Sequence, residues 1–460
     1  MSELTLELTP EPGPALVPPA PPVVEPIRWK PATRLAFRFA FCYFMLFALC
    51  CGNATIWEII PVAGGYIEDW LSRPFTYAGQ WLAQHYFHIQ GAGAKLHETG
   101  SGDTAISWIA LGVMFSVAVL ATLIWTALDR KSTAYPKLFA WFRFTIRLTL
   151  GYAMLTYGLA KLFPLQMAPP SLAVLNEPFG NLSPMTLLWT MLGYNPLYQM
   201  ICGGAEALGG LLIFFRRTAL AGALLIAFLS TNIVLYNFFF DVPVKLYAAH
   251  LLLMSLAVIV PDIRALFGFF WQHRPTAPTV PWAPWSPRLI RRLHITVENL
   301  VVAICLLLFA GFASFQLGKA VSHQRASQRN PPPITGQWHV DSALLNGQPK
   351  PFLTGDGQPM TDIFLEPSSR TMVRDSATVL WRGGFHIDDK KHTVNFGTVG
   401  SGDNTIYALA QPDPNHLILT PTGKEAKTVG TLTLTRVPLP THYPLLDRGF
   451  HWVNEWGLER

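Results

Sequence analysis

Seven long apolar stretches constrain this chain more than any other feature of its sequence. Each has close to the roughly 17–25 residues that a helix needs to cross about 30 Å of hydrocarbon. Charged residues make up 13% of the chain and hydrophobic residues 50%, whereas soluble domains carry about 25% charged residues. The sequence therefore predicts a multi-pass α-helical membrane protein with about seven spans. The expected spans are 35–57, 104–128, 144–163, 196–215, 218–240, 244–260 and 294–317.

Lysine and arginine gather in alternate loops between these stretches. The basic segments precede the first span and join the second to the third, the fourth to the fifth and the sixth to the seventh; they include Arg34, Arg130, Lys137, Arg216 and Arg264. Cytoplasmic loops carry such an excess. We therefore expect a bacterial inner-membrane protein with a cytoplasmic N-terminus, and we attribute its net charge of +6 to topology rather than to nucleic-acid binding.

The segments between and around the spans differ in composition. The prolines of the segment before the last span recur every third residue, which predicts polyproline II. That segment is interpreted either as a stiff strap along the membrane or as a docking site for a proline-binding partner. The expected divisions are a disordered cytoplasmic tail (1–32), two spans with a long aromatic outer loop that forms interfacial helices (33–137), a four-span core (138–270), a cytoplasmic polyproline strap (271–292), a last span (293–319), an extracytoplasmic β domain (334–437) and an aromatic tail (438–460).

The region after the last span changes from helical to strand patterning. "NPPP" ends the helix, and short alternating runs follow, among them "GQWHVDSALL" (336–345) and "VLWRGGFHID" (379–388). Turn residues such as "DDKK" and "PDPN" separate several runs, so about eight strands in meander order are predicted. Trp338 near the start and Arg436 near the end resemble lipocalin and fatty-acid-binding-protein barrels, in which an arginine of the last strand covers a tryptophan of the first. Such a barrel holds either one small ligand or a packed interior.

Short-range signals predict several helix ends. Asp103 in "GSGDT" is expected to cap the second span. Ser183 as N-cap and Pro184 at the first helical position predict a short helix over 184–192, too short to span, across the outer mouth of the bundle. Pro243 suits the first turn of the sixth span.

Cysteine and histidine give weaker signals. All five cysteines lie in apolar stretches, so no disulfide framework is predicted. The vicinal pair Cys50–Cys51 is either two small core residues or a redox pair. His85 and His88 share a helical face, but no third ligand has a recognisable spacing, so no metal site is predicted.

Polar residues concentrate in the outer half of spans three to six. An ionised side chain that faces lipid near the centre of a span costs several kcal/mol, so such residues normally face the bundle interior and pair. Those near the interface have a structural alternative, because they can extend to water. The candidate ligand-binding residues are Tyr157, Lys161, Glu206, Asn237, Asp241, Lys245 and His250.

Glu206 is the most deeply placed of these carboxylates. It lies about ten residues, or roughly 15 Å, below the outer end of its span. Gly203, Ala207 and Gly210 form a small-residue stripe around it that lets neighbouring helices approach closely. His250 lies at a comparable depth, so we expect it to be the nearest partner of Glu206, with a lysine reaching down from above.

Three segments, "LTYGLAKLFP", "GGAEALGGLLIFFRR" and "NFFFDVPVKLYAAHLLLMSL", resemble the DoxX-like family of bacterial membrane proteins. The resemblance covers residues 140–270 and implies a four-helix membrane bundle. Some relatives are associated with redox systems, including a subunit of a thiosulfate:quinone oxidoreductase, and others accompany thiol or oxidative-stress proteins. No catalytic motif carries over residue by residue.

Three functions are compatible with this sequence. The first is a non-catalytic subunit that binds a quinone or a lipid-like molecule in a redox or envelope process, with a periplasmic or membrane redox partner. The alternatives are a proton-coupled small-molecule transporter and a membrane scaffold that recruits partners through its outer barrel. An enzyme acting alone has the least support, because the chain has no Walker A, G-x-S-x-G, C-x-x-C or dinucleotide-binding motif.

Overall fold

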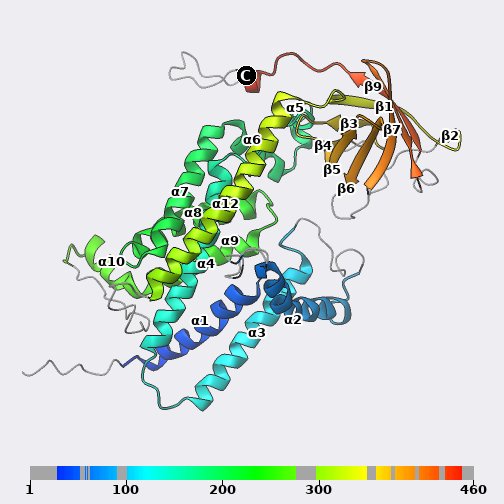
Figure 1. The fold of residues 1–460 in the computed structure, drawn as a ribbon. Helices are drawn as coiled ribbons and strands as arrows, with labels where there is room; N and C mark the ends of the chain where they lie inside the picture. The colour runs from blue at the N-terminus through cyan, green and yellow to red at the C-terminus, as the bar shows by residue number, and fades with distance from the viewer. Residues whose placement is uncertain are drawn as a thin grey trace, which may run out of the picture.

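The helical region and a β-barrel lie at opposite ends of the molecule (Figure 1). The structure is a computed structural model, which describes residues 28–51, 57, 60, 63–90, 101–275, 297–349, 359–374, 379–398, 404–423 and 430–447. Most of the predicted N-terminal tail, polyproline strap and C-terminal tail falls outside these ranges.

The helical region contains long helices joined by short ones. The helix α12 runs along the outside of the bundle and connects it to the barrel (Figure 1). The helices are α1 (Pro31–Cys50), α2 (Ala63–His85), α3 (Ala105–Leu128), α4 (Pro136–Leu162), α5 (Leu172–Leu175), α6 (Pro184–Tyr194), α7 (Pro196–Phe214), α8 (Ala219–Phe239), α9 (Lys245–Ile259), α10 (Ile263–Phe270), α12 (Val297–Arg329) and α13 (Pro444–Asp447).

Six described segments are long and apolar enough to cross a membrane: α1, α3, α7, α8, α9 together with α10, and α12. The third predicted span, 144–163, corresponds to α4, which has 27 residues and is not among these six. Its charged residues, including Arg147 and Lys161, lower its mean hydropathy. Both side chains are buried inside the protein, so the polarity of α4 reflects contacts within the bundle. The last predicted span ends at 317, whereas α12 continues to Arg329.

Arg147 joins α4 to the end of α7. Its guanidinium donates from Nε to the carbonyl oxygen of Ile213, 2.8 Å away, and from Nη2 to that of Phe214. The last carbonyl groups of a helix lack partners within the helix and carry partial negative charge, so a buried arginine stabilises them. The charge that lowers the hydropathy of α4 therefore has a structural role.

The first helix is anchored to the loop between α3 and α4. The backbone N–H of Trp29 donates to the carbonyl oxygen of Thr133 at 3.0 Å. Arg38 donates to the carbonyl oxygen of Asp129 at 2.6 Å and to the Tyr135 hydroxyl. Hydrogen bonds from Ser132 and then from Tyr135 lower the pKa of Asp129 to about 2. These contacts hold Trp29 and the first turns of α1 against the loop between α3 and α4.

The predicted meander is confirmed as a closed antiparallel barrel. Strands β1 and β3 to β9 pair in sequence order, and β1 also pairs with β9, which closes the sheet. The short strand β2 pairs antiparallel with the last residues of β1. The predicted run 336–345 coincides with β1, and 379–388 coincides with β5. The strands are β1 (Gly336–Leu345), β2 (Gln348–Pro349), β3 (Asp362–Leu365), β4 (Arg370–Arg374), β5 (Val379–Asp388), β6 (Thr393–Thr398), β7 (Asn404–Asp413), β8 (His416–Pro421) and β9 (Thr431–Val437).

One end of the barrel is organised around Trp338. Its side chain is fully buried, and its indole N–H donates to the carbonyl oxygen of Ile334 at 2.8 Å. The Arg436 guanidinium lies 4.5 Å from the centre of the indole ring and donates to the carbonyl oxygen of Thr335 at 3.1 Å. The expected cover of a first-strand tryptophan by a last-strand arginine is therefore present, and it adds a cation–π contact. Buried aliphatic and aromatic side chains fill the barrel core; they include Leu365, Val394, Tyr407, Leu417, Leu419 and Leu434.

The barrel contacts the helical region through the short helix α5. Glu366 at the end of β3 accepts hydrogen bonds from the backbone N–H groups of Leu172 and Ala173, both at 3.2 Å. Arg374 of β4 forms an ion pair with Glu177 at 2.9 Å. Burial raises the pKa of Glu366, and the two backbone hydrogen bonds oppose this shift. No local pattern in the sequence predicts this contact, because its partners are about two hundred residues apart in the chain.

Candidate functional site

A buried ion pair between Lys161 and Glu206 lies at the centre of the four-helix core. Lys161 stands in the last turn of α4 and Glu206 in the middle of α7. The distance from Nζ to Oε2 is 2.6 Å, and the two side chains are 7% and 5% exposed. A charge-assisted hydrogen bond of this length is strong. The prediction that Glu206 pairs inside the bundle, with a lysine reaching down to it, is confirmed.

The backbones of α4 and α7, the helices that carry this pair, are in close contact at glycine residues. A Cβ atom on Gly158 would lie 2.5 Å from the backbone nitrogen of Ala207, and one on Gly203 would lie 2.5 Å from the carbonyl oxygen of Gly158. These two glycines each precede a member of the ion pair by three residues, which places them on the same helix face. The predicted small-residue stripe therefore brings the two backbones together at the position where the charges must meet.

The ion pair keeps hydrogen-bonding capacity. An ammonium group has three donors, and a carboxylate has about four acceptor positions. Within the described residues, the Glu206 carboxylate is the one hydrogen-bond partner of Lys161 Nζ. Two aromatic residues lie beside the pair: Nζ is 5.9 Å from the centre of the Tyr157 ring, and Tyr236 of α8 lies within electrostatic range of Glu206. Two of the three ammonium hydrogens of Lys161 are therefore not used in the bond to Glu206.

The side chain of Gln199 holds the loop after α4 against α7. It donates from Nε2 to the carbonyl oxygen of Met167 at 2.9 Å, and its Oε1 accepts from the backbone N–H of Met167 at 3.1 Å. The predicted short helix follows as α6, where Ser183 accepts from the N–H of Thr186. These contacts fix the chain that leaves α4 immediately beyond Lys161.

His250 does not pair with Glu206, and that prediction is wrong. Its Nδ1 lies 2.7 Å from the carbonyl oxygen of Leu246, and its Nε2 lies 2.7 Å from the Tyr43 hydroxyl. A carbonyl only accepts, so in the neutral ring Nδ1 carries the hydrogen and Nε2 accepts from Tyr43. The ring also stacks on Phe47, with centroids 3.8 Å apart. The helix α1, outside the predicted four-helix core, therefore supplies the partners of His250.

Asp241 and Lys245 form a partly exposed ion pair at the start of α9. The distance from Nζ to Oδ1 is 2.8 Å, and the side chains of Asp241 and Lys245 are 81% and 18% exposed. Asp241 adopts a φ of 51°, so the chain turns sharply here. Pro243 precedes α9 rather than lying in its first turn, because the helix begins at Lys245.

The N-terminus of α9 is capped from another part of the chain. Asp103 accepts from the backbone N–H of Lys245 at 2.6 Å and from that of Leu246 at 3.0 Å. Its predicted role as the cap of the second span is wrong, since Thr104 caps α3 by accepting from Ser107. Asp103 instead joins the entry of α3 to the entry of α9.

Asn237 is buried near the same end of α8. Its Nδ2 donates to the carbonyl oxygen of Val244 over 3.4 Å, and its residue exposure is 1%. Its Oδ1 has no hydrogen-bond partner among the residues that the structure describes. A buried carbonyl without a partner costs free energy, so this atom is a position where a bound molecule or water would be favourable.

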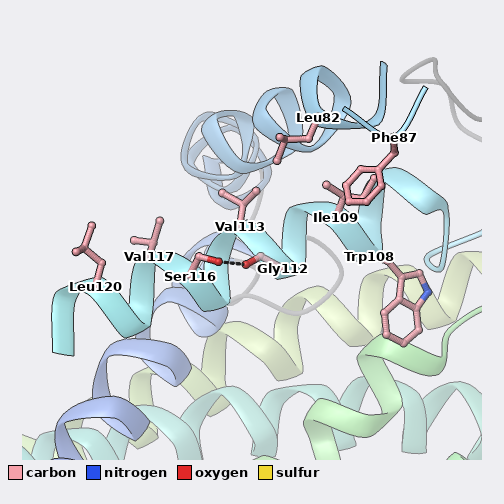
Figure 2. A pocket seen from close by; sticks show the side chains of 9 residues that line it. All are labelled: Leu82, Phe87, Trp108, Ile109, Gly112, Val113, Ser116, Val117 and Leu120. Carbon is pink, nitrogen blue, oxygen red and sulfur yellow. Dashed lines mark hydrogen bonds between the residues drawn. The ribbon is translucent and has the colours of Figure 1, made fainter. Parts of the chain in front are cut away.

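A separate apolar groove of about 660 Å³ lies between α2 and α3. Figure 2 shows its lining side chains and the hydrogen bond from Ser116 Oγ to the carbonyl oxygen of Gly112, which is 2.9 Å long. That bond satisfies the hydroxyl, so the groove offers mainly carbon atoms to a ligand. Its lining residues are Leu82, Phe87, Trp108, Ile109, Gly112, Val113, Ser116, Val117 and Leu120.

The residues that the structure describes show neither a metal-binding cluster nor a disulfide bond. In the described ranges, no group of three or more His, Cys, Asp or Glu residues is arranged to hold a metal ion. His85 bonds to the carbonyl oxygen of Trp81 at 3.0 Å. The five cysteines, including Cys50 and Cys51, are free thiols.

One curated protein resembles part of this chain. It is described as "Uncharacterized protein YwoB" of Bacillus subtilis (strain 168), and it is 34% identical over 137 residues, which are 28% of this chain and 81% of the relative. No family model matches the chain. No solved structure matches it either.

Proposed function

This chain belongs to the same family as Bacillus subtilis YwoB, and we propose that it is a non-catalytic subunit of the bacterial inner membrane that binds a quinone or a lipid-like molecule. The bundle of α4, α7, α8 and α9 would be the DoxX-like core. The basic helix ends would face the cytoplasm and the barrel would face the outside. Its role would be in a redox or envelope process, together with a periplasmic or membrane redox partner.

The observation that carries this proposal is the buried Lys161–Glu206 pair with its remaining hydrogen-bond capacity. Apolar pockets that bind cofactors use a few convergent polar groups to orient the ligand. A quinone ring offers two carbonyl acceptors, which suit the ammonium hydrogens of Lys161 and the phenol of Tyr236, with the Tyr157 ring beside Lys161. The unpartnered Oδ1 of Asn237 in α8 would accept only from a hydroxyl, as in a reduced quinol or a lipid-like molecule.

The closed geometry of the pair explains why we propose binding rather than catalysis. Lys161 and Glu206 neutralise each other at 2.6 Å, so neither is a free base or nucleophile. Burial of both charges is expensive unless both are paired. A ligand that hydrogen-bonds to the pair would therefore be held without the pair being separated.

Lipid extraction tests this proposal. The full chain is purified in mild detergent, and bound quinone and phospholipid are measured by native mass spectrometry and by chromatography of an organic extract. The double variant Lys161→Met/Glu206→Gln removes both charges together, which avoids leaving one charge buried. The matched control is Lys391→Met/Asp388→Asn, which removes an exposed lysine–carboxylate pair of the barrel.

The proposal predicts about one quinone or lipid-like molecule per chain in the wild type and in the control variant, and at least a tenfold loss in the core variant. Folding of each variant is checked by size-exclusion chromatography. Equal amounts of ligand in a folded core variant would place binding elsewhere. The absence of bound quinone and of any stoichiometric lipid from the wild type would contradict the proposed function.

A further inference from the structure

The helix α10 presents an exposed apolar face at the end of the molecule opposite the barrel (Figure 1). Ile263, Phe267, Phe270 and Trp271 are 56%, 53%, 69% and 76% exposed. They are spaced three or four residues apart, or follow directly, so they lie on one side of the helix. Leu266, beside this face, packs partly buried against the bundle core, and Phe269 is also 56% exposed. The helix is therefore held to the bundle through Leu266 and projects five large apolar groups.

The position of α10 is fixed at both of its ends. Asp262, directly before it, forms an ion pair with Arg143 of α4 at 3.5 Å. At its C-terminus His273 adopts a φ of 52°, and the backbone N–H of Arg274 donates to the carbonyl oxygen of Gly268 at 3.0 Å. This is the pattern of a left-handed helix cap. The exposed face consequently belongs to an ordered element.

Basic residues lie at the same level as α10. Arg143 and Arg147 are one turn apart on α4; the first contacts Asp262 and the second contacts the last carbonyl groups of α7. The ends of α7 and of α9 are therefore level with each other. Arg217, which follows α7, and Arg264, in the first turn of α10, are both exposed. Arg274 is exposed at the far end of the helix.

We propose that α10 is a surface anchor that binds anionic phospholipids in the leaflet at this end of the protein. Phe267, Phe270 and Trp271 would enter the acyl region, and Arg264 and Arg274 would contact the phosphate groups at either end of the helix. Amphipathic helices with aromatic and basic residues lie in the interface in this way. The occupant is a lipid because α9, the three residues after it and α10 together form one candidate membrane span, Lys245–Phe270, so α10 is the end of that span that reaches the bilayer surface.

The test uses the full chain in nanodiscs of phosphatidylcholine that contain increasing fractions of phosphatidylglycerol. Native mass spectrometry counts the phosphatidylglycerol molecules that remain bound. The test variant is Arg264→Gln/Arg274→Gln. The control is Lys390→Gln/Lys391→Gln, which makes the same change of charge at exposed positions of the barrel.

Each basic residue near an anionic surface changes affinity by about fivefold, so the arginine variant should bind phosphatidylglycerol about 25-fold more weakly than the wild type. The control should bind as the wild type does. A second variant, Phe267→Ser/Phe270→Ser, should retain fewer bound molecules of both phosphatidylcholine and phosphatidylglycerol than the wild type. The proposal would be overturned if the wild type showed no preference for phosphatidylglycerol, or if the arginine variant kept the preference of the wild type. Neither result depends on the Lys161–Glu206 site.

Discussion

The sharpest prediction concerns the energetic coupling between Lys161 and Glu206. Replacing either residue alone leaves the other as an uncompensated buried charge, which costs about 3–5 kcal/mol. Replacing both with uncharged side chains of similar volume removes the attraction together with the burial of charge, and is often close to neutral. The single variants Lys161→Met and Glu206→Gln should therefore each destabilise the bundle strongly, whereas the double variant should recover most of that loss.

The geometry supports a large coupling energy. The two charged atoms are 2.6 Å apart, and both side chains are less than a tenth exposed, so water screens the pair weakly. We expect a coupling of about 3 kcal/mol or more from the double-mutant cycle. The pair Asp241–Lys245, in which the carboxylate is 81% exposed, gives the comparison: its coupling should be smaller and closer to the roughly 0.2–1 kcal/mol of exposed pairs.

The assay is denaturant unfolding of the four proteins of each cycle in one mixed-micelle system. A third cycle pairs Glu206→Gln with His250→Leu. These two residues bond to different partners in the structure, so their effects should add within about 0.5 kcal/mol. Additive effects for Lys161 and Glu206, or strong coupling of Glu206 with His250, would refute the arrangement of the site described above.

Four further predictions follow from single contacts. Trp338→Ala should destabilise the barrel by about 3–5 kcal/mol in thermal unfolding, because it removes a fully buried aromatic side chain. Gly158→Ala should lower the stability of the bundle by about 1–3 kcal/mol, because the new Cβ meets backbone at 2.5 Å, while Gly112→Ala, with open space around it, should be neutral. Asp103→Ala should cost about 1 kcal/mol through loss of the α9 cap, measured by the unfolding midpoint. Burial raises the pKa of Glu366 above its ordinary value of 4.5, so the folded state binds the Glu366 proton more tightly than the unfolded state does. The stability of the protein should therefore fall as pH rises through the folded pKa. Glu366→Gln should abolish this dependence of the melting temperature on pH.

Local sequence signals predicted the parts of this fold that depend on near neighbours. Alternation with a period of two and turn residues placed β1 and β5 at their observed limits. The small residues around Gly203 predicted the close helix contact, and Ser183 predicted the start of α6. Each of these features is fixed by residues within a turn or two of the chain, so their patterns survive in the sequence.

Partners that are distant in the chain could not be predicted in the same way. Tyr43 and His250 are 207 residues apart, and depth alone suggested Glu206 as the partner of His250. The position of a residue along a helix determines its depth in the membrane, but it does not determine which neighbouring helix the side chain faces. Asp103 was misassigned for a related reason: proximity in sequence favoured capping of α3, but Thr104 fills that position and frees Asp103 for α9.

The central claim, that the Lys161–Glu206 pair holds the polar head of a bound quinone or lipid-like molecule, is tested most directly by photo-crosslinking. A benzoquinone with a photoreactive group on its ring is reacted with the full chain in nanodiscs, and the labelled peptides are identified by mass spectrometry. The account predicts labels on α4 and α7 near Lys161 and Glu206, suppressed by excess unlabelled quinone. Labels confined to the groove between α2 and α3, or no competable label at all, would contradict it.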